Sequence, residues 1–113
     1  MLEDKALPRG VPTLVAEAIT ATGTANVRPF SVLGVPGAIN SVICQAIGTF
    51  TAFSGNIEAS SDGQTTWSIF AAFDFVSTNA KFITFDAFPG LSYRFNVSVI
   101  TQTVAPSIRA TLK

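Results

Sequence analysis

The side chains that could carry out chemistry are few in this chain, and their spacing matches no known catalytic pattern. There is no histidine and only one cysteine, Cys44, which excludes a histidine-based triad, a histidine-ligated zinc and a thiolate cluster. Asp62, Asp74 and Asp86 recur every twelve residues, whereas a calcium loop collects its ligands within a single stretch of that length. We therefore expect no enzymatic activity, no catalytic or metal-binding residue and no cofactor.

The most structured phrase is "EASSDGQTTWSIF", residues 58–70. Its Asp62-Gly63 pair is typical of a tight hairpin turn, which needs positive φ. Trp67 follows the turn and could be displayed to stack on a sugar ring. It shares its parity with the apolar residues of the strand that follows, so we predict that it lies in the core, together with Phe73, Phe95 and Val97.

The composition indicates one small domain that meets a partner. The 113 residues are 48% apolar and only 12% charged, well below the usual share of about 25% charged. Such a chain exposes apolar surface, which often marks an interface. The net charge is zero and Lys/Arg runs are absent, so we expect no nucleic-acid partner. The apolar runs are too short to span a membrane. The first residues do not resemble a signal peptide, so we expect synthesis in the cytoplasm. Cys44 lies in an apolar run, so we expect it to be buried and inert.

Residues 1–12 are predicted to form an extended N-terminal arm, separate from a domain over residues 13–113. Pro8, Gly10 and Pro12 rule out a regular helix or a central strand there. The segment could be a frayed terminus, or it could order only when it drapes over a neighbouring subunit.

The remainder alternates between strand and turn signals. Gly48 lies in the middle of a long β-branched and aromatic run and predicts a bulge or a bend between two sheets. Seven or eight strands are expected, without a convincing helix, which indicates an all-β, antiparallel β-sandwich that is jelly-roll-like. The expected strand segments are 27–33, 40–53, 80–88, 91–100 and 107–113, together with a hairpin over 55–77. Residues 13–19 could be a short strand or one helical turn.

The segment 80–88 is apolar on both faces. Phe82 and Phe88 have one parity, and Ile83 and Phe85 have the other. Either a partner subunit covers one face, or a bulge shifts the register. We predict that one of these two pairs forms an interface and that the protein is a homo-oligomer. The candidate interface residues are Phe82, Ile83, Phe85, Phe88, Leu2 and Leu7.

Residues 55–113 contain "GNIEASSDGQTTWSIF" and "FPGLSYRFNVSVITQTVAPSIRATLK". This succession resembles small virion proteins of tailed bacteriophages, in which a "GS-DG-TTW"-like turn is followed by a strand of the type Tyr-x-Arg-x-x-Val. Tyr93, Arg94, Asn96 and Val97 occupy that strand here. The resemblance implies a β-sandwich component of the virion, with the major capsid protein or other virion proteins as partners. A capsid decoration (cement) protein is our main hypothesis. The alternatives are a neck or tail accessory protein, or a carbohydrate-binding module.

Overall fold

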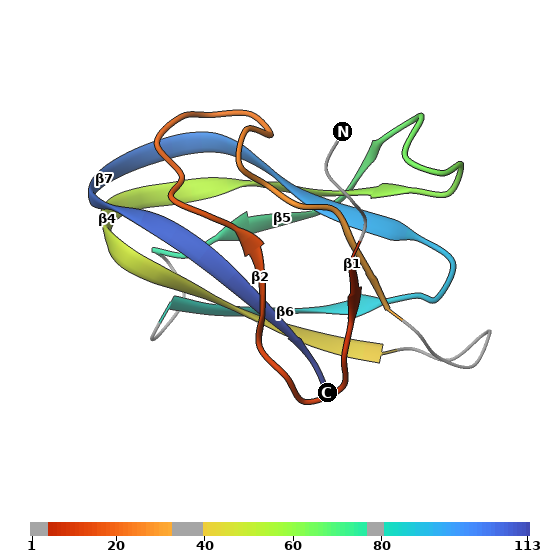
Figure 1. Cartoon of the computed structure of the whole chain (residues 1–113). Coiled ribbons are helices and arrows are strands. Elements are labelled where there is room, and N and C mark those ends of the chain that lie inside the picture. The colour runs from red at the N-terminus through yellow and green to blue at the C-terminus, as the bar shows by residue number, and fades with distance from the viewer. Residues whose placement is uncertain (1–4, 33–39, 77–80) are drawn as a thin grey trace.

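The computed structural model describes residues 5–32, 40–76 and 81–113, and all regular elements of these residues are β-strands (Figure 1). They form one open, mixed, seven-stranded sheet in the order β1-β3-β7-β4-β5, while β2 pairs with β7 and β6 pairs with β4. The strands are β1 (Lys5–Leu7), β2 (Thr13–Ala16), β3 (Phe30–Val32), β4 (Asn40–Ser60), β5 (Ser68–Asp74), β6 (Phe82–Ala87) and β7 (Ser92–Leu112). The all-β prediction is confirmed, whereas the sandwich and its jelly-roll-like connectivity stay predictions.

The two long strands, β4 and β7, pair antiparallel along almost their whole length and form the spine of the sheet. The first part of β4 pairs with β6 and the last part with β5. Likewise, β3 pairs with the start of β7 and β2 with its end. The sequence predicted separate strands at 91–100 and 107–113, but both belong to β7. No tight-turn sequence lies between them, so the chain bends without leaving the sheet.

The two long strands bend at the left of Figure 1, and Gly48 lies within β4, where the register against β7 shifts. Its φ of +146° is in a region that other residues avoid, and a Cβ there would lie 2.7 Å from the Cα of Pro106 on β7. The β4–β7 register also shifts between Ile47 and Ala52. These shifts exchange the parity of the buried side chains of β4, from Val42 and Cys44 before the bend to Phe53 after it. Of the two predicted alternatives at Gly48, the irregularity within the strand is confirmed, whereas a bend between two separate sheets stays a prediction.

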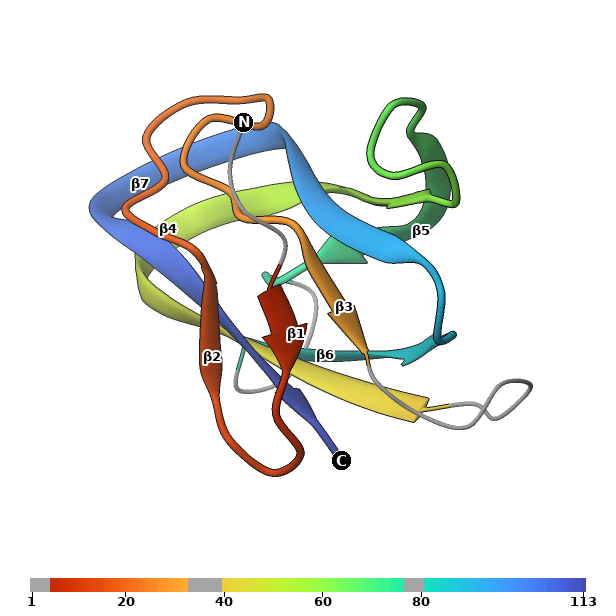
Figure 2. The ribbon, with the colours of Figure 1, turned by 45° about the vertical axis from the view of Figure 1, so that its right-hand side comes forward.

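The core lies between the two halves of the bent sheet (Figure 2). One half is aromatic: the rings of Phe73 and Phe95 are 5.0 Å apart and those of Phe53 and Phe75 are 5.2 Å apart. The other half contributes smaller side chains from β4 and β7, such as Cys44 and the alternating Ile108, Ala110 and Leu112. The halves face each other, because Phe85 of β6 lies 5.4 Å from Tyr93 of β7. The predicted burial of Phe73, Phe95, Val97 and Cys44 is confirmed.

The described part of the predicted arm belongs to the chain's own sheet. β1 pairs in parallel with β3, and Leu7 is buried in the core. The N–H of Gly10 donates to the C=O of Leu112 at 2.7 Å, and the guanidinium of Arg9 donates to the C=O of Lys113. For residues 5–12, the prediction of a segment that orders only against a neighbour is therefore wrong. The prolines interrupt the strands, but the residues between and beside the prolines still pair with other strands.

Candidate functional site

β6 presents the interface residues that the sequence predicted. It pairs with β4 through six successive residue pairs, from Asn40–Ala87 to Gln45–Phe82, with no shift of register. Because side chains alternate along an uninterrupted strand, Ile83 and Phe85 turn toward the core, where they pack against its buried residues. Phe82 lies on the outer side, and Phe88 follows the end of the strand, where its ring lies 6.3 Å from that of Phe70; each of the two is 38% exposed.

This register decides between the two explanations offered for the doubly apolar segment. A bulge would have brought both sets of side chains to one face, and β6 shows none over residues 82–87. The bulge explanation is therefore wrong for β6. Ile83, Phe85 and Leu7 serve the chain's own core and cannot be free interface residues. Leu2 lies outside the described residues. Of the two predicted pairs, the one that is exposed is Phe82 and Phe88.

β6 also has an unpaired edge, because β4 is its only neighbour in the described part of the sheet. The N–H of Lys113 donates to the C=O of Ser41 at 3.0 Å, so the polar groups of Ser41 point toward β7. The N–H and C=O groups alternate in direction along a strand, so those of Val42 point toward β6. There Val42 lies opposite Phe85, whose own N–H and C=O point back toward β4. It follows that the N–H and C=O groups of Phe82, Thr84 and Asp86 point to the open edge.

β5 also has an open edge, because within the described residues it pairs with β4 only, and a bulge interrupts it. Ile57 of β4 pairs with Ala71 and Glu58 pairs with Ile69, which leaves Phe70 as the additional residue. The ring of Phe70 lies 5.2 Å from that of Tyr93 and 6.3 Å from that of Phe88. Aromatic contacts therefore bridge the two open edges, while Ile69 is 69% exposed.

Trp67 does not lie in the core, and this prediction is wrong. The guanidinium carbon of Arg94 lies 4.3 Å from the centre of the Trp67 ring, on the outer face of the sheet. Glu58 and Arg94 are directly opposed in the β4–β7 register, and Arg94 Nε donates to Glu58 Oε1 at 2.8 Å. Asn96 Nδ2 donates to the other carboxylate oxygen at 3.3 Å. The bulge at Phe70 shifts the parity of the strand, so Phe70 reaches the core and Trp67 does not.

The loop between β4, which ends at Ser60, and β5, which begins at Ser68, is longer than the predicted tight turn. Gly63 and Gln64 have φ values of +72° and +73°, which confirms a change of chain direction with positive φ at this place. Asp62 accepts hydrogen bonds from the N–H of Thr66 at 2.9 Å and from the hydroxyl of Ser60 at 2.8 Å. The bond from the Thr66 N–H is the main reason that the pKa of Asp62 is lowered to about 2. Asp62 thus has a structural role in ordering the loop that carries Trp67.

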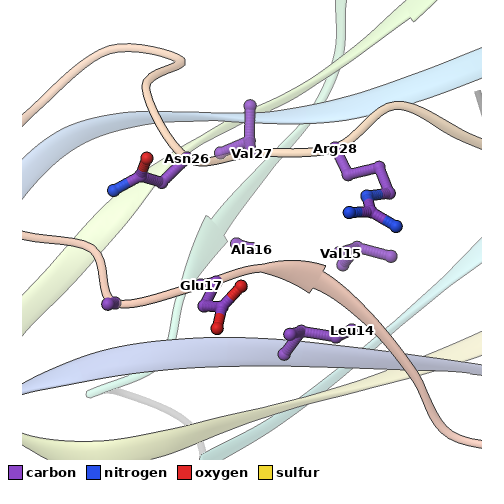
Figure 3. A pocket seen from close by; sticks show the side chains of 8 residues that line it. Leu14, Val15, Ala16, Glu17, Asn26, Val27 and Arg28 are labelled. Atoms are coloured by element: carbon purple, nitrogen blue, oxygen red, sulfur yellow. The ribbon is translucent and has the colours of Figure 1, made fainter. Parts of the chain in front are cut away.

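A depression of about 300 Å³ lies between β2 and residues 26–28 (Figure 3). The two segments bond to each other through the backbone: the N–H of Glu17 donates to the C=O of Asn26, and the N–H of Arg28 donates to the C=O of Val15. Its lining contains a single carboxylate, that of Glu17, and no cysteine. The arrangement therefore offers neither a pair of acids for proton transfer nor an activated nucleophile.

No group of three metal-ligating side chains occurs among residues 5–32, 40–76 and 81–113. Burial raises the pKa of the Cys44 thiol, which makes it unreactive. Within the same residues there is no helix of the length and apolarity needed to cross a membrane. Comparisons with protein-family models, with curated proteins and with solved structures found no match.

Proposed function

We propose that the protein is a non-enzymatic structural component of a tailed-bacteriophage particle, and that it is a capsid decoration (cement) protein that stabilises the head shell. The resemblance of residues 55–113 to small virion proteins supports this proposal. We also propose that the two facing halves of the sheet are the layers of a β-sandwich, the fold which that resemblance implies. The expected partner is the major capsid protein or another virion protein.

The observation that carries the proposal is the outer face of β6. A strand with an uninterrupted register, an unpaired edge and two exposed phenylalanines, Phe82 and Phe88, presents both apolar surface and free backbone groups. Natural proteins usually protect such an edge with lysine, proline or a bulge. Residues 82–88 contain none of the three. Docking on another subunit would protect the edge and cover the phenylalanines.

Attachment through this face would rest on apolar burial and backbone pairing. The segment 82–88 carries a single charge, that of Asp86. Salt screens exposed charges over about 8 Å at physiological ionic strength, but it does not weaken apolar contacts. The bound protein should therefore remain on particles in molar salt and be released by denaturant. Because residues 5–12 are held in the chain's own sheet, the main attachment is assigned to β6 rather than to an N-terminal arm.

The test adds the protein back to purified heads that lack it, and compares two double variants. Phe82→Ser with Phe88→Ser should reduce the bound copies about tenfold or more, since each buried phenylalanine contributes about 1.5–3 kcal/mol. Val99→Ser with Val104→Ser is the matched control, because both valines are exposed on β7. Mass spectrometry gives the ratio to the major capsid protein, and circular dichroism verifies the fold. Equal binding by both variants, or release by salt alone, would contradict the proposal.

The same ratio separates the head from the other virion positions. A cement protein is present in many copies per particle and scales with the major capsid protein. A neck or tail accessory protein is present in few copies and stays with tails after the heads are removed. Purified particles separated into heads and tails therefore decide between these placements.

A second candidate function, glycan binding, is favoured by the outer position of Trp67. Glu58 is occupied by Arg94 and Asn96, which leaves the terminal amino groups of Arg94 without a hydrogen-bond partner among the described residues. A cation, a ring and polar amides on one face are groups that can recognise a sugar. Since Trp67 is the only tryptophan, titration with bacterial surface oligosaccharides should change its fluorescence. Unchanged emission together with no retention on immobilised glycans would rule this candidate out.

A further inference from the structure

The outer side of β6 has a sequence that complements itself. Its outward residues within the strand are Phe82, Thr84 and Asp86, and Phe88 follows the strand; all four are exposed. Read in reverse, the series is phenylalanine, aspartate, threonine and phenylalanine, so Thr84 and Asp86 exchange places. An antiparallel copy of this strand can therefore match hydroxyl with carboxylate at two outward positions and bring Phe82 opposite Phe88.

We propose that β6 pairs antiparallel with β6 of a second copy of this chain, around a two-fold axis that passes beside Phe85. In this register Phe82 of one copy lies opposite Phe88 of the other, and Thr84 lies opposite Asp86. Each Thr84 hydroxyl can then donate to the carboxylate of the facing Asp86. The inference rests on the proposed function, because the pairing covers the open edge of β6 and leaves the outer face of both strands free to attach to the shell.

The backbone of β6 is arranged for this register. The polar groups of Thr84 and Asp86 point to the open edge, as the hydrogen bond between Lys113 and Ser41 requires. Residues opposed in this way exchange both of their N–H···O=C bonds in an antiparallel ladder. The N–H of Phe88 is already donated to the hydroxyl of Tyr93 at 2.8 Å, so the new ladder ends there. The two-fold axis falls at Phe85. The backbone N–H and C=O of this residue point to β4, so the new ladder does not use them.

The neighbouring registers are chemically poorer. A shift by two residues in one direction places Thr84 opposite itself and Phe82 opposite Asp86, which buries a charge against a ring. A shift in the other direction places Asp86 opposite Asp86, and like charges that face each other are destabilising. The β5 edge offers no equivalent, because the bulge at Phe70 interrupts its ladder.

The test measures the oligomeric state of the purified full chain in the absence of heads, by sedimentation equilibrium over a wide range of concentrations. The wild type should show a concentration-dependent dimer. Thr84→Asp places two like-charge pairs in the interface and should weaken the dimer by about two- to thirtyfold. Thr84→Lys places each introduced lysine opposite Asp86 and should tighten the dimer by a similar factor. Thr84 is exposed, so neither change disturbs the core.

The lysine variant also identifies the register. If Thr84 faced itself, the introduced lysines would repel and the dimer would weaken, which would overturn the proposed pairing. A wild type that stays monomeric, or a dimer that neither variant alters, would overturn it as well. Binding to heads is measured separately: a monomer that still binds refutes only the dimer, whereas a dimer that does not bind refutes only the cement function.

Discussion

β5 and β6 both pair with β4 alone among the described strands and leave an open edge, and each carries two phenylalanines three residues apart. In β5 these are Phe70 and Phe73, and in β6 they are Phe82 and Phe85. A spacing of three places one ring on each side of a regular strand. β5 inserts Phe70 as an additional residue, and both of its rings contact the aromatic core. β6 keeps its register, so Phe85 contacts the core and Phe82 stays outside.

The difference shows what a bulge does to an apolar edge. One additional residue in β5 moves an aromatic ring from the outer face to the rings of Tyr93 and Phe85. The same residue moves Trp67 out of the core and onto Arg94. Without such a residue, β6 keeps Phe82 exposed on its outer side. The two edges thus differ in whether the second ring is brought into contact with the core.

The largest expected effect tests the inward side of β5. Phe73 is buried, with the rings of Phe53, Phe75 and Phe95 between 5.0 and 5.8 Å away. Phe73→Ala should lower the free energy of unfolding by about 3–5 kcal/mol, because it removes a large ring and leaves a cavity. Denaturant unfolding measures the loss. Phe82→Ala is the matched control on β6 and should change the stability by less than about 0.5 kcal/mol. Similar losses in the two variants would contradict the difference between the edges.

A smaller effect tests the exchange of Phe70 and Trp67. Phe70 keeps part of its ring exposed while it contacts three aromatic rings, so Phe70→Ala should cost about 1–3 kcal/mol. Trp67→Ala removes a ring that makes a cation–π contact with the guanidinium of Arg94. Such a contact contributes about 0.5–1 kcal/mol at an exposed site. Both losses are measured by chemical unfolding. A larger loss for Trp67 than for Phe70 would indicate that the strand has no bulge.

The sequence predicted the features that depend on local residue types. The strands, the irregularity at Gly48, and the burial of Phe73 and Phe95 follow from alternation and from the conformational freedom of glycine. A bulge depends instead on how well a ring fits against the facing strands, and alternation alone does not show this. The parity of Phe70, an exception within its strand, was the available signal, because an apolar residue on the polar side of a strand suggests an additional residue nearby.

The features that the sequence did not predict depend on contacts between distant segments. Glu58 and Arg94 are 36 positions apart, and they meet only because the β4–β7 register opposes them. The pairing of residues 5–10 with β3 and Leu112 is likewise non-local. Within the predicted interface, parity separated Phe82 and Phe88 from Ile83 and Phe85. It did not show which pair faces outward, because that depends on the side of β4 that meets the core.

Another small effect concerns the place where the two edges meet. The hydroxyl of Tyr93 accepts the N–H of Phe88 and joins the end of β6 to β7, beside the ring of Phe70. Tyr93→Phe removes this acceptor and should cost about 0.5–1.5 kcal/mol. Hydrogen exchange of the Phe88 amide should become faster, while the β4–β6 amides should keep their protection.

Alkaline pH provides a second measurement of the same residue. Burial raises the pKa of Tyr93 in the folded protein, although the hydrogen bond from Phe88 partly opposes the shift. Above the ordinary pKa of about 10, the unfolded chain loses this proton before the folded one does. The unfolded state then binds fewer protons, so the stability falls as the pH rises. Below that pH, the contribution is fully present. The wild type should therefore lose stability more steeply above pH ~10 than Tyr93→Phe, which has no proton to lose. Parallel curves for the two proteins would show that the hydroxyl is accessible to water, and that the junction between β6 and β7 is open.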